Sequence, residues 1–380
     1  MADPSNLIRI MPAEGMRAWR SHHVLRFPTR TKDNDLTLAS PLPGPLSLTG
    51  LFTLTGILAI SGEALAQDAG KPVLTVYTYE SFVPEWGPGP KIEEAFEARC
   101  ECDLRFEGLA DGVAILNRLK LEGASSPADI VIGLTTDLVP EAKATGLFAE
   151  SGTDLSPLAL PIDYSDPVFV PFDYSYLAVM VDTEAAENWP KSLAELVSGD
   201  REQTIAIEDP RTSTPGLGFL LWMKAVYGED AKAKWEELAE RILTVTPGWS
   251  EAYGLFTSGE VPLVMSYSTS EAYHRIEEES ERYRAADFSE GLYLQIEVAG
   301  MLAGSDNPDL ARQFLAFILT PEFQSIIPTG NWAYPVIEGI DLPPAFDDLI
   351  EVKNPIYIDP EIVAKNRQAW TQEWLEALGR

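Results

Sequence analysis

The stretch Asp209-Pro-Arg-Thr-Ser-Thr-Pro-Gly-Leu-Gly218 marks the junction between a strand and a helix. It follows Thr204–Glu208, a short apolar run with β-branched residues, and leads into the apolar run Phe219–Val226. Thr214 suits the N-cap of the helix, and Pro215 suits its first position. The stretch therefore indicates a β-loop-α unit, the building block of α/β domains.

The start of this helix has the features of an anion-binding site. Its free backbone N–H groups and the positive end of its dipole face whatever lies in front of it. Ser213 and Thr214 add two hydroxyl groups at the same place. The segment is a candidate for holding a phosphate without a charged side chain, although an ordinary capped helix shows the same pattern.

The β-loop-α pattern recurs along the chain and predicts a mainly parallel sheet with helices on both faces. β-branched and aromatic residues mark the strands, and apolar residues three and four positions apart mark the helices. The expected strands are 72–79, 102–106, 129–134, 204–208, 261–267 and 293–298, and the expected helices are 91–99, 113–122, 192–198, 215–227, 231–242, 309–319 and 361–378.

Two long extended runs, 167–181 and 261–270, are candidates for segments that cross between two lobes. No low-complexity linker divides the chain after residue 66, which fits two lobes joined by more than one strand. We expect lobe 1 to begin with 67–175, lobe 2 to comprise 176–265, and 266–380 to return mainly to lobe 1 and to supply the C-terminal helices.

The N-terminal segment resembles an export signal. A basic region precedes the apolar run Leu46–Ile60, which has about the length of a signal h-region and is short for a membrane span. Ala64-Leu-Ala66 then supplies a small-x-small cleavage pattern. We expect residues 1–66 to be removed and the mature protein to begin at or near Gln67 in the periplasm; a retained membrane anchor is the alternative.

Removal of this segment leaves a strongly acidic chain. Six of the 28 basic residues and five of the 59 acidic residues lie in 1–66, which leaves 22 basic and 54 acidic residues and a net charge near −32. Such a charge argues against nucleic acid or an anionic membrane as a partner. It favours a cationic ligand only weakly, because acidity also promotes solubility.

Histidine and cysteine are too scarce for most metal or catalytic sites. His274 is the only histidine after residue 66, so a histidine-rich metal site is excluded, and no G-x-S-x-G elbow supports a serine triad. Cys100 and Cys102 are too close together for a structural zinc site. In an oxidising compartment they are compatible with a disulfide or with two thiols.

Aromatic residues gather where loops follow strands, the positions that form the ligand crevice of open α/β sheets. Trp249 and Trp332 stand beside glycine or proline rather than on a helix or strand face, whereas Trp222 and Trp235 fit helix faces and are assigned to the core. Aromatic faces attract cations. Asp111, in a turn between a strand and a helix, can supply a carboxylate or serve as an N-cap.

Several stretches after residue 70 are distinctive together: Pro72–Tyr79, Trp86-Gly-Pro-Gly-Pro90, Asp209–Gly218, Gly248-Trp-Ser-Glu-Ala-Tyr-Gly-Leu-Phe256, Phe288-Ser-Glu-Gly291 and Pro328-Thr-Gly-Asn-Trp332. Through these stretches the chain, from Lys71 to the C-terminus, resembles the thiamine-binding periplasmic proteins, the substrate-binding components of bacterial thiamine ABC importers. The Cys-x-Cys pair also matches that family.

The resemblance implies a type II periplasmic binding protein fold, in which two α/β lobes enclose a ligand cleft. It implies thiamine, thiamine monophosphate or thiamine diphosphate as the transported ligand, and neither a catalytic residue nor a cofactor nor a metal. The ligand contacts that it implies are Tyr79, Asp111, Gly112, Ser213, Thr214, Trp249, Tyr267, Ser268, Thr269, Ser270, Tyr273 and Trp332.

The expected partners are the membrane permease of a thiamine ABC importer with its ATPase, and the protein is expected to be a monomer.

Tyr273 and Trp332 can stack on a flat cation, Asp111 can accept from an amino group, and Ser213 with Thr214 can hold a hydroxyl or a phosphate. The alternatives are a binder of a polyamine or of ferric ion with the same fold, and a secreted enzyme.

Overall fold

The computed structural model of the protein describes residues 70–353 and 355–379. The expected export signal, residues 1–66, lies outside the described residues. Within the described ranges, no helix is both long enough and apolar enough to cross a membrane.

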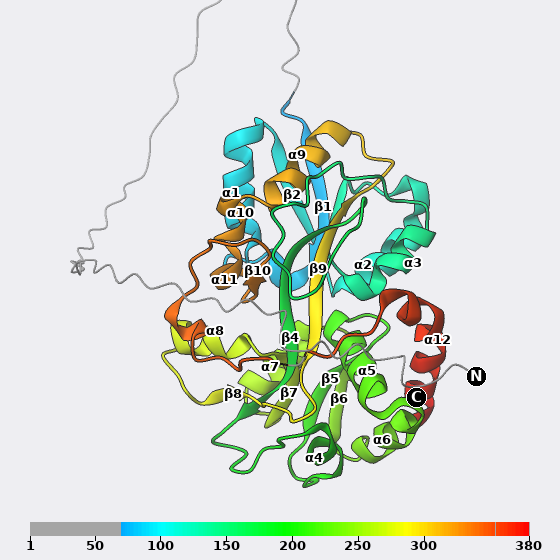
Figure 1. Ribbon diagram of the computed structural model, residues 1–380, viewed down its shortest axis with the longest axis vertical. Coiled ribbons are helices and arrows are strands. Elements are labelled where there is room, and N and C mark those ends of the chain that lie inside the picture. The colour runs from blue at the N-terminus through cyan, green and yellow to red at the C-terminus, as the bar shows by residue number, and fades with distance from the viewer. Residues whose placement is uncertain (1–69, 354, 380) are drawn as a thin grey trace, which may run out of the picture. The chain divides into compact units, whose positions relative to one another are not determined.

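One mixed sheet runs through the molecule in the order β2-β1-β3-β9-β4-β7-β5-β6, and β8 and β10 pair with β4 (Figure 1). The two outer groups, β2-β1-β3 and β7-β5-β6, are parallel, whereas β4 and β9 between them run antiparallel to their neighbours. The strands are β1 Val73–Tyr79, β2 Asp103–Leu109, β3 Ile130–Thr135, β4 Val170–Asp182, β5 Ile205–Glu208, β6 Ile242–Thr246, β7 Leu263–Tyr267, β8 Tyr283–Ala285, β9 Tyr293–Met301 and β10 Tyr334–Pro335.

β4 and β9 are the two strands that join the two parallel groups. β9 pairs with β3 on one side and with β4 on the other, and β4 continues to pair with β7. The long run at 167–181 is therefore a connecting segment, as expected. The expectation for 261–270 was wrong: β7 lies between β4 and β5 inside the second group, and β9 makes the second connection.

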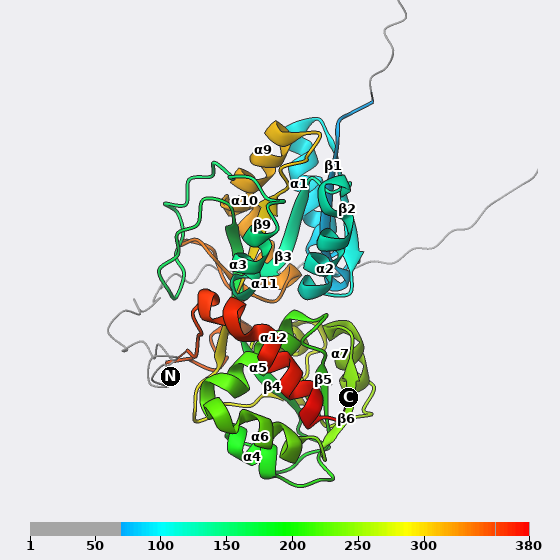
Figure 2. The ribbon, with the colours of Figure 1, turned by 90° about the vertical axis from the view of Figure 1, so that its right-hand side faces the viewer.

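The helices form two groups around the two parallel parts of the sheet (Figures 1 and 2). One group accompanies β1, β2 and β3, and the other accompanies β5, β6 and β7. The C-terminal helix α12 packs against α5 and α6 and also against α3. The helices are α1 Gly89–Cys100, α2 Gly112–Glu122, α3 Val139–Ala144, α4 Leu193–Ser198, α5 Thr214–Tyr227, α6 Ala231–Leu238, α7 Trp249–Thr257, α8 Ser270–Glu277, α9 Pro308–Ile318, α10 Pro321–Gln324, α11 Ile327–Gly330 and α12 Pro360–Ala377.

The helix that follows Glu208 begins one residue earlier than predicted, at Thr214 instead of Pro215. Ser213 is the N-cap of α5, because its backbone is extended and its Oγ accepts a hydrogen bond from the N–H of Gly216. Thr214 is the first helical residue, and Pro215 is the second. Trp222 in α5 and Trp235 in α6 are buried, which confirms their assignment to the core.

The expected helix 231–242 was too long. It ends at Leu238, and a strand, β6, begins at Ile242 and pairs in parallel with β5. The β-branched residues of Ile242–Thr246 favour the strand, and the sheet provides the partner that makes it form.

Cys100 and Cys102 form a disulfide at the end of α1. Glu101 between them has φ 51° and is the left-handed C-cap residue of the helix. Of the two alternatives left open by the sequence, the structure therefore contains the disulfide.

Candidate ligand-binding site

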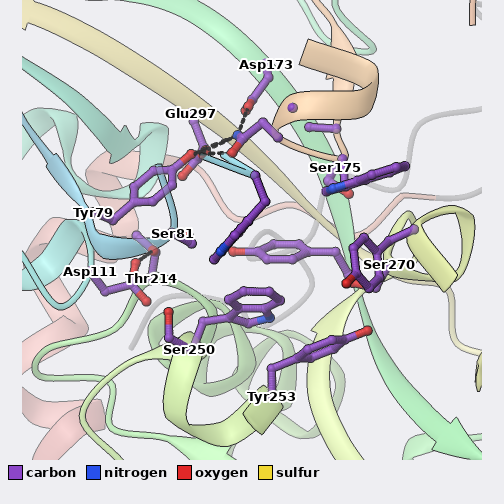
Figure 3. A pocket seen from close by; sticks show the side chains of 18 of the residues that line it. Tyr79, Ser81, Asp111, Asp173, Ser175, Thr214, Ser250, Tyr253, Ser270 and Glu297 are labelled. Atoms are coloured by element: carbon purple, nitrogen blue, oxygen red, sulfur yellow. Dashed lines mark hydrogen bonds between the residues drawn. The ribbon is translucent and has the colours of Figure 1, made fainter. Parts of the chain in front are cut away.

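A cavity of about 440 Å³ opens where strand ends and loops of the two halves of the sheet face each other (Figure 3). Tyr79 and Asp111 reach it from the β1 and β2 side, and Thr214, Trp249 and Tyr267 reach it from the β5 and β7 side. Residues of both lobes therefore line one cavity. Its size suits a small organic molecule rather than a single ion.

Aromatic rings form much of the cavity wall. Trp249, the first residue of α7, stacks on Tyr253 with ring centroids 4.6 Å apart, and its Nε1 donates to Ser266 Oγ at 2.8 Å. Tyr273 meets Trp332 edge to face at 5.3 Å. These contacts fix the orientation of the rings.

Trp332 adopts an uncommon backbone conformation. Its φ is 52°, in the left-handed region that a bulky residue rarely occupies. The residue lies in the turn between α11 and β10, and its indole lines the cavity. Such strain persists where surrounding contacts hold it, and it occurs often at binding sites.

Asp111 occupies the place in front of α5 that the sequence assigned to an anionic ligand. Its Oδ1 accepts from the backbone N–H of Gly112 at 2.8 Å, which caps α2, and from the hydroxyl of Thr214. Its Oδ2 accepts from the hydroxyl of Ser213 at 2.8 Å. The hydroxyl groups expected to hold a phosphate thus donate to a carboxylate of the protein in this structure.

Two opposing effects act on the pKa of Asp111. Burial raises its pKa above the usual value, and the hydrogen bonds from Thr214, Gly112 and Ser213 offset part of that rise. Glu208 lies behind it at the end of β5, and burial together with the charge of Asp111 raises the pKa of Glu208 strongly. Neither oxygen of the Glu208 carboxyl has a hydrogen-bond partner among the described residues.

Gly112 has a packing role in this arrangement. A Cβ at this position would lie 2.2 Å from the carbonyl oxygen of Gly133 and 2.9 Å from Cγ2 of Thr214. Any side chain at 112 would therefore push α2 away from β3 and α5. Gly112 itself is not among the residues that line the cavity.

The segment Tyr267–Ser270 only partly faces the cavity. Tyr267 lines it and its hydroxyl accepts from Gln295 Nε2 at 2.9 Å, and Ser270 lines it as well. Ser268 and Thr269 are fully buried and do not line it, and Thr269 Oγ1 lies 2.9 Å from Oγ of the lining residue Ser175. The strand ends at Tyr267, and the chain turns at Ser268 and Thr269 into α8, so the four side chains do not share one face.

A carboxyl cluster that the sequence analysis missed lies at one end of the cavity (Figure 3). Asp173 on β4 stands directly opposite Glu297 on β9. The side-chain amide of Asn331 donates to Oδ2 of Asp173 and, at 2.8 Å, to the hydroxyl of Tyr79. That hydroxyl donates to Oε2 of Glu297 at 2.9 Å. Four residues from four separate segments thus form one hydrogen-bonded group.

The acidic residues Asp173 and Glu297 lie inside the runs Val170–Asp182 and Tyr293–Met301, most of whose other residues are apolar or aromatic. A carboxylate inside a buried strand is rare unless it has a partner or a function. That composition was the signal available in the sequence. The pairing of the two residues was not available, because it depends on the antiparallel register of β4 and β9.

Most of the predicted contacts meet in this cavity. The predicted residues that line it are Tyr79, Asp111, Thr214, Trp249, Tyr267, Ser270, Tyr273 and Trp332, and those that do not are Gly112, Ser213, Ser268 and Thr269. Polar and aromatic lining residues not predicted include Ser81, Trp86, Asp173, Ser175, Ser250, Tyr253, Thr257, Glu278, Gln295, Glu297 and Asn331.

Comparison with known proteins gives one consistent result. Residues 125–366 match the family of bacterial extracellular solute-binding proteins. The chain is 53% identical over 331 residues to the thiamine-binding periplasmic protein of Brucella abortus biovar 1, with 87% of this chain and 98% of that protein covered. It is 52% identical to the protein of that name in Escherichia coli K12, with 82% and 94% covered.

A solved structure agrees with these relatives. The structure of a periplasmic thiamin binding protein superposes with a TM-score of 0.79 and 52% sequence identity, and 82% of this chain and 97% of that chain are covered. The expected type II periplasmic binding fold, with two α/β lobes and a cleft between them, is thereby confirmed.

Proposed function

The chain belongs to the family of thiamine-binding periplasmic proteins, and from this membership we propose that its cavity captures thiamine and delivers it to the permease and ATPase of an ABC importer. Members of this family are periplasmic solute-binding proteins rather than enzymes. Export through an N-terminal signal that ends near Gln67 is part of the proposal.

The observation that carries the proposal is the combination of aromatic walls and carboxyl groups in one cavity. Asp111, Asp173, Glu278 and Glu297 line it, and no lysine, arginine or histidine of the described chain does. Thiamine carries a permanent positive charge on a flat ring, which aromatic faces and carboxylates both attract. The lining thus supports a flat cationic ligand.

Phosphate esters of thiamine are proposed as further ligands. Thr214 lines the cavity at the N-terminus of α5, where free N–H groups and the helix dipole favour an anion. Asp111 already accepts hydrogen bonds from Ser213 and Thr214 there. A phosphate would have to share or replace these bonds, so its acceptance depends on Asp111.

Titration calorimetry of the protein with thiamine, thiamine monophosphate and thiamine diphosphate tests the proposal. We expect saturable binding of thiamine and its recovery unchanged by chromatography. Absence of binding would refute the proposed ligand, and conversion of thiamine would favour the alternative of a secreted enzyme. Spermidine and ferric ion serve as the competing ligands, and tighter binding of either would replace thiamine as the solute.

A further inference from the structure

The carboxyl pair at the end of the cavity is fixed in position by the sheet. Asp173 and Glu297 face each other across the antiparallel strands β4 and β9, and their side chains are on the same face. Their residues are only 1% and 7% exposed, yet both line the cavity. Their carboxyl groups are therefore held in place and open toward the ligand space (Figure 3).

Of the two carboxyl groups, Asp173 loses its proton first as the pH rises. Burial raises the pKa of Asp173 to about 7. Burial, and then the negative charge of Asp173, raises the pKa of Glu297 much further. Hydrogen bonding between the two groups lowers the pKa of Asp173 and raises that of Glu297, so Glu297 keeps the proton.

The groups around the pair leave its charge uncompensated. Tyr79 faces it from β1, Asn331 faces it from the turn after α11, and Asp111 acts on Glu297 from the start of α2. No arginine, lysine or histidine in the described part of the chain shifts the pKa of either carboxyl. Once Asp173 has lost its proton, the pair thus presents one negative charge and hydrogen-bond acceptors.

The other carboxylates of the cavity are already engaged. Asp111 accepts from Gly112, Ser213 and Thr214, and Glu278 lies 2.8 Å from Nδ1 of His274. Asp173 accepts from Asn331 and from Glu297, fewer donors than Asp111 has, so it retains more acceptor capacity toward a ligand than Asp111 does.

Thiamine carries a cationic thiazolium ring and a pyrimidine ring with an amino group, and the two suit different parts of the cavity. The quaternary thiazolium nitrogen has no N–H and cannot donate a hydrogen bond, so aromatic faces such as that of Trp332 suit it. The amino group on the pyrimidine ring does donate. A fixed, charged acceptor is the complement of that group.

We propose that Asp173 and Glu297 determine specificity in this site: the Asp173 carboxylate, held by Glu297 and Asn331, accepts a hydrogen bond from the amino group of the ligand's pyrimidine ring. The inference rests on the proposed binding of thiamine and assigns an orientation to the ligand. The amino-bearing ring lies at the β4–β9 end of the cavity, and the alcohol arm points toward Thr214 and the start of α5.

A comparison of thiamine with oxythiamine, in which an oxygen replaces the pyrimidine amino group, tests this assignment. An acceptor that meets an oxygen instead of an amino donor loses the hydrogen bond. We expect wild-type protein to prefer thiamine by roughly 10- to 100-fold, the range produced by loss of a hydrogen bond to a charged group. Asp173→Asn should reduce this preference to within about threefold, because the charge is gone and the amide can donate to the oxygen.

Glu297→Gln is the conservative variant. Glu297 acts by positioning Asp173, and the Gln amide can donate to Asp173 as the protonated carboxyl does, so the ratio of the two affinities should be retained even where both affinities change. Asp137→Asn is the matched control: Asp137 is buried, burial raises its pKa to about 7, and it accepts from Tyr293 at 3.0 Å, but it does not line the cavity. This variant should leave both affinities unchanged.

Three results would overturn the inference. These are a wild-type protein that binds both ligands equally, an Asp173→Asn variant that binds thiamine as tightly as wild type, and an Asp173→Asn variant that loses affinity for both ligands by the same factor. The last result would assign a structural role. The wild-type ratio needs no variant, so the test stands even if Asp173→Asn fails to fold. Failure of wild type to bind thiamine at all would refute the proposed function instead.

Discussion

Trp332 has an uncommon left-handed backbone conformation, and its indole lines the cavity. The ring of Tyr273 packs edge to face against this indole. We expect Trp332→Ala and Tyr273→Ala each to weaken thiamine binding by roughly 1–3 kcal/mol, because stacking area and cation–π attraction are both lost. Trp332→Leu should recover part of the area without the attraction. Fluorescence or calorimetric titration measures the change.

Trp189→Ala is a suitable control for these variants, since that indole packs against the ammonium group of Lys191 and does not line the cavity. It should leave binding unchanged. Wild-type affinity in Trp332→Ala would show that this ring does not stack on the ligand.

The pKa of Asp173 predicts how binding responds to pH. Below pH 6 both Asp173 and Glu297 are protonated, and as pH rises through about 7 Asp173 becomes charged. A cationic ligand favours the charged form, so binding releases a proton, and thiamine affinity should increase by about tenfold between pH 6 and pH 8. Calorimetry at constant ionic strength measures this.

The pH response should largely disappear in Asp173→Asn and persist in Asp137→Asn, whose carboxyl titrates in the same range outside the cavity. An affinity that falls with rising pH would contradict the assignment of the charge.

At the scale of elements, the N-termini of α2 and α5 converge on one carboxylate. Asp111 caps α2 and accepts from the hydroxyls of Ser213 and Thr214 at the start of α5. The helix start that favours an anion therefore already has one. This arrangement makes Asp111 the residue on which acceptance of a phosphate depends.

Asp111→Asn should separate the effects of charge on the two kinds of ligand. Loss of the negative charge should weaken binding of thiamine and should favour thiamine monophosphate relative to thiamine, because repulsion of the phosphate decreases. Parallel titration of both ligands measures the ratio. An unchanged affinity with a lower free energy of unfolding would instead mean that Asp111 acts only as a cap.

The double variant Ser213→Ala with Thr214→Ala tests the helix start itself. It should reduce affinity for thiamine monophosphate and diphosphate more than for thiamine, since charge-assisted hydrogen bonds to phosphate are lost. These contact bonds should outweigh repulsion by the acidic chain, which salt screens over about 8 Å. Equal losses for the three ligands would show that the segment serves only the internal contact with Asp111.

The contrast between α5 and the carboxyl pair shows what could be predicted from the sequence. The start of α5 is local, so cap and proline patterns placed it to within one residue. The Asp173–Glu297 pair is not local, because it requires β9 to insert between β3 and β4. For the same reason the second connecting strand was assigned to 261–270 instead of to Tyr293–Met301.

At the scale of the whole molecule, one sheet connects both lobes through β4 and β9. The carboxyl pair lies on these two strands, so the residues proposed to recognise the amino group belong to the connection between the lobes. Trp249 and Thr214 lie in the second half and Tyr79 in the first. A ligand that contacts all of these residues therefore bridges the two lobes and also contacts the two strands that join the lobes.

Export of the whole chain gives a further test. The apolar run Leu46–Ile60 followed by Ala64-Leu-Ala66 predicts cleavage that leaves Gln67 at or near the N-terminus. Intact-mass measurement of the exported protein should therefore lack residues 1–66. A mass that includes residues 1–60 would reject cleavage and support the retained anchor.

The redox state of Cys100 and Cys102, which form a disulfide in the structure, should show which compartment a copy of the protein has reached. Such bonds persist in oxidising compartments and are rare in the cytosol. Copies still awaiting export should carry two thiols that an alkylating reagent modifies, whereas exported copies should resist it. Because these are the only two cysteines in the chain, alkylation followed by mass spectrometry would report the exported fraction directly from whole cells.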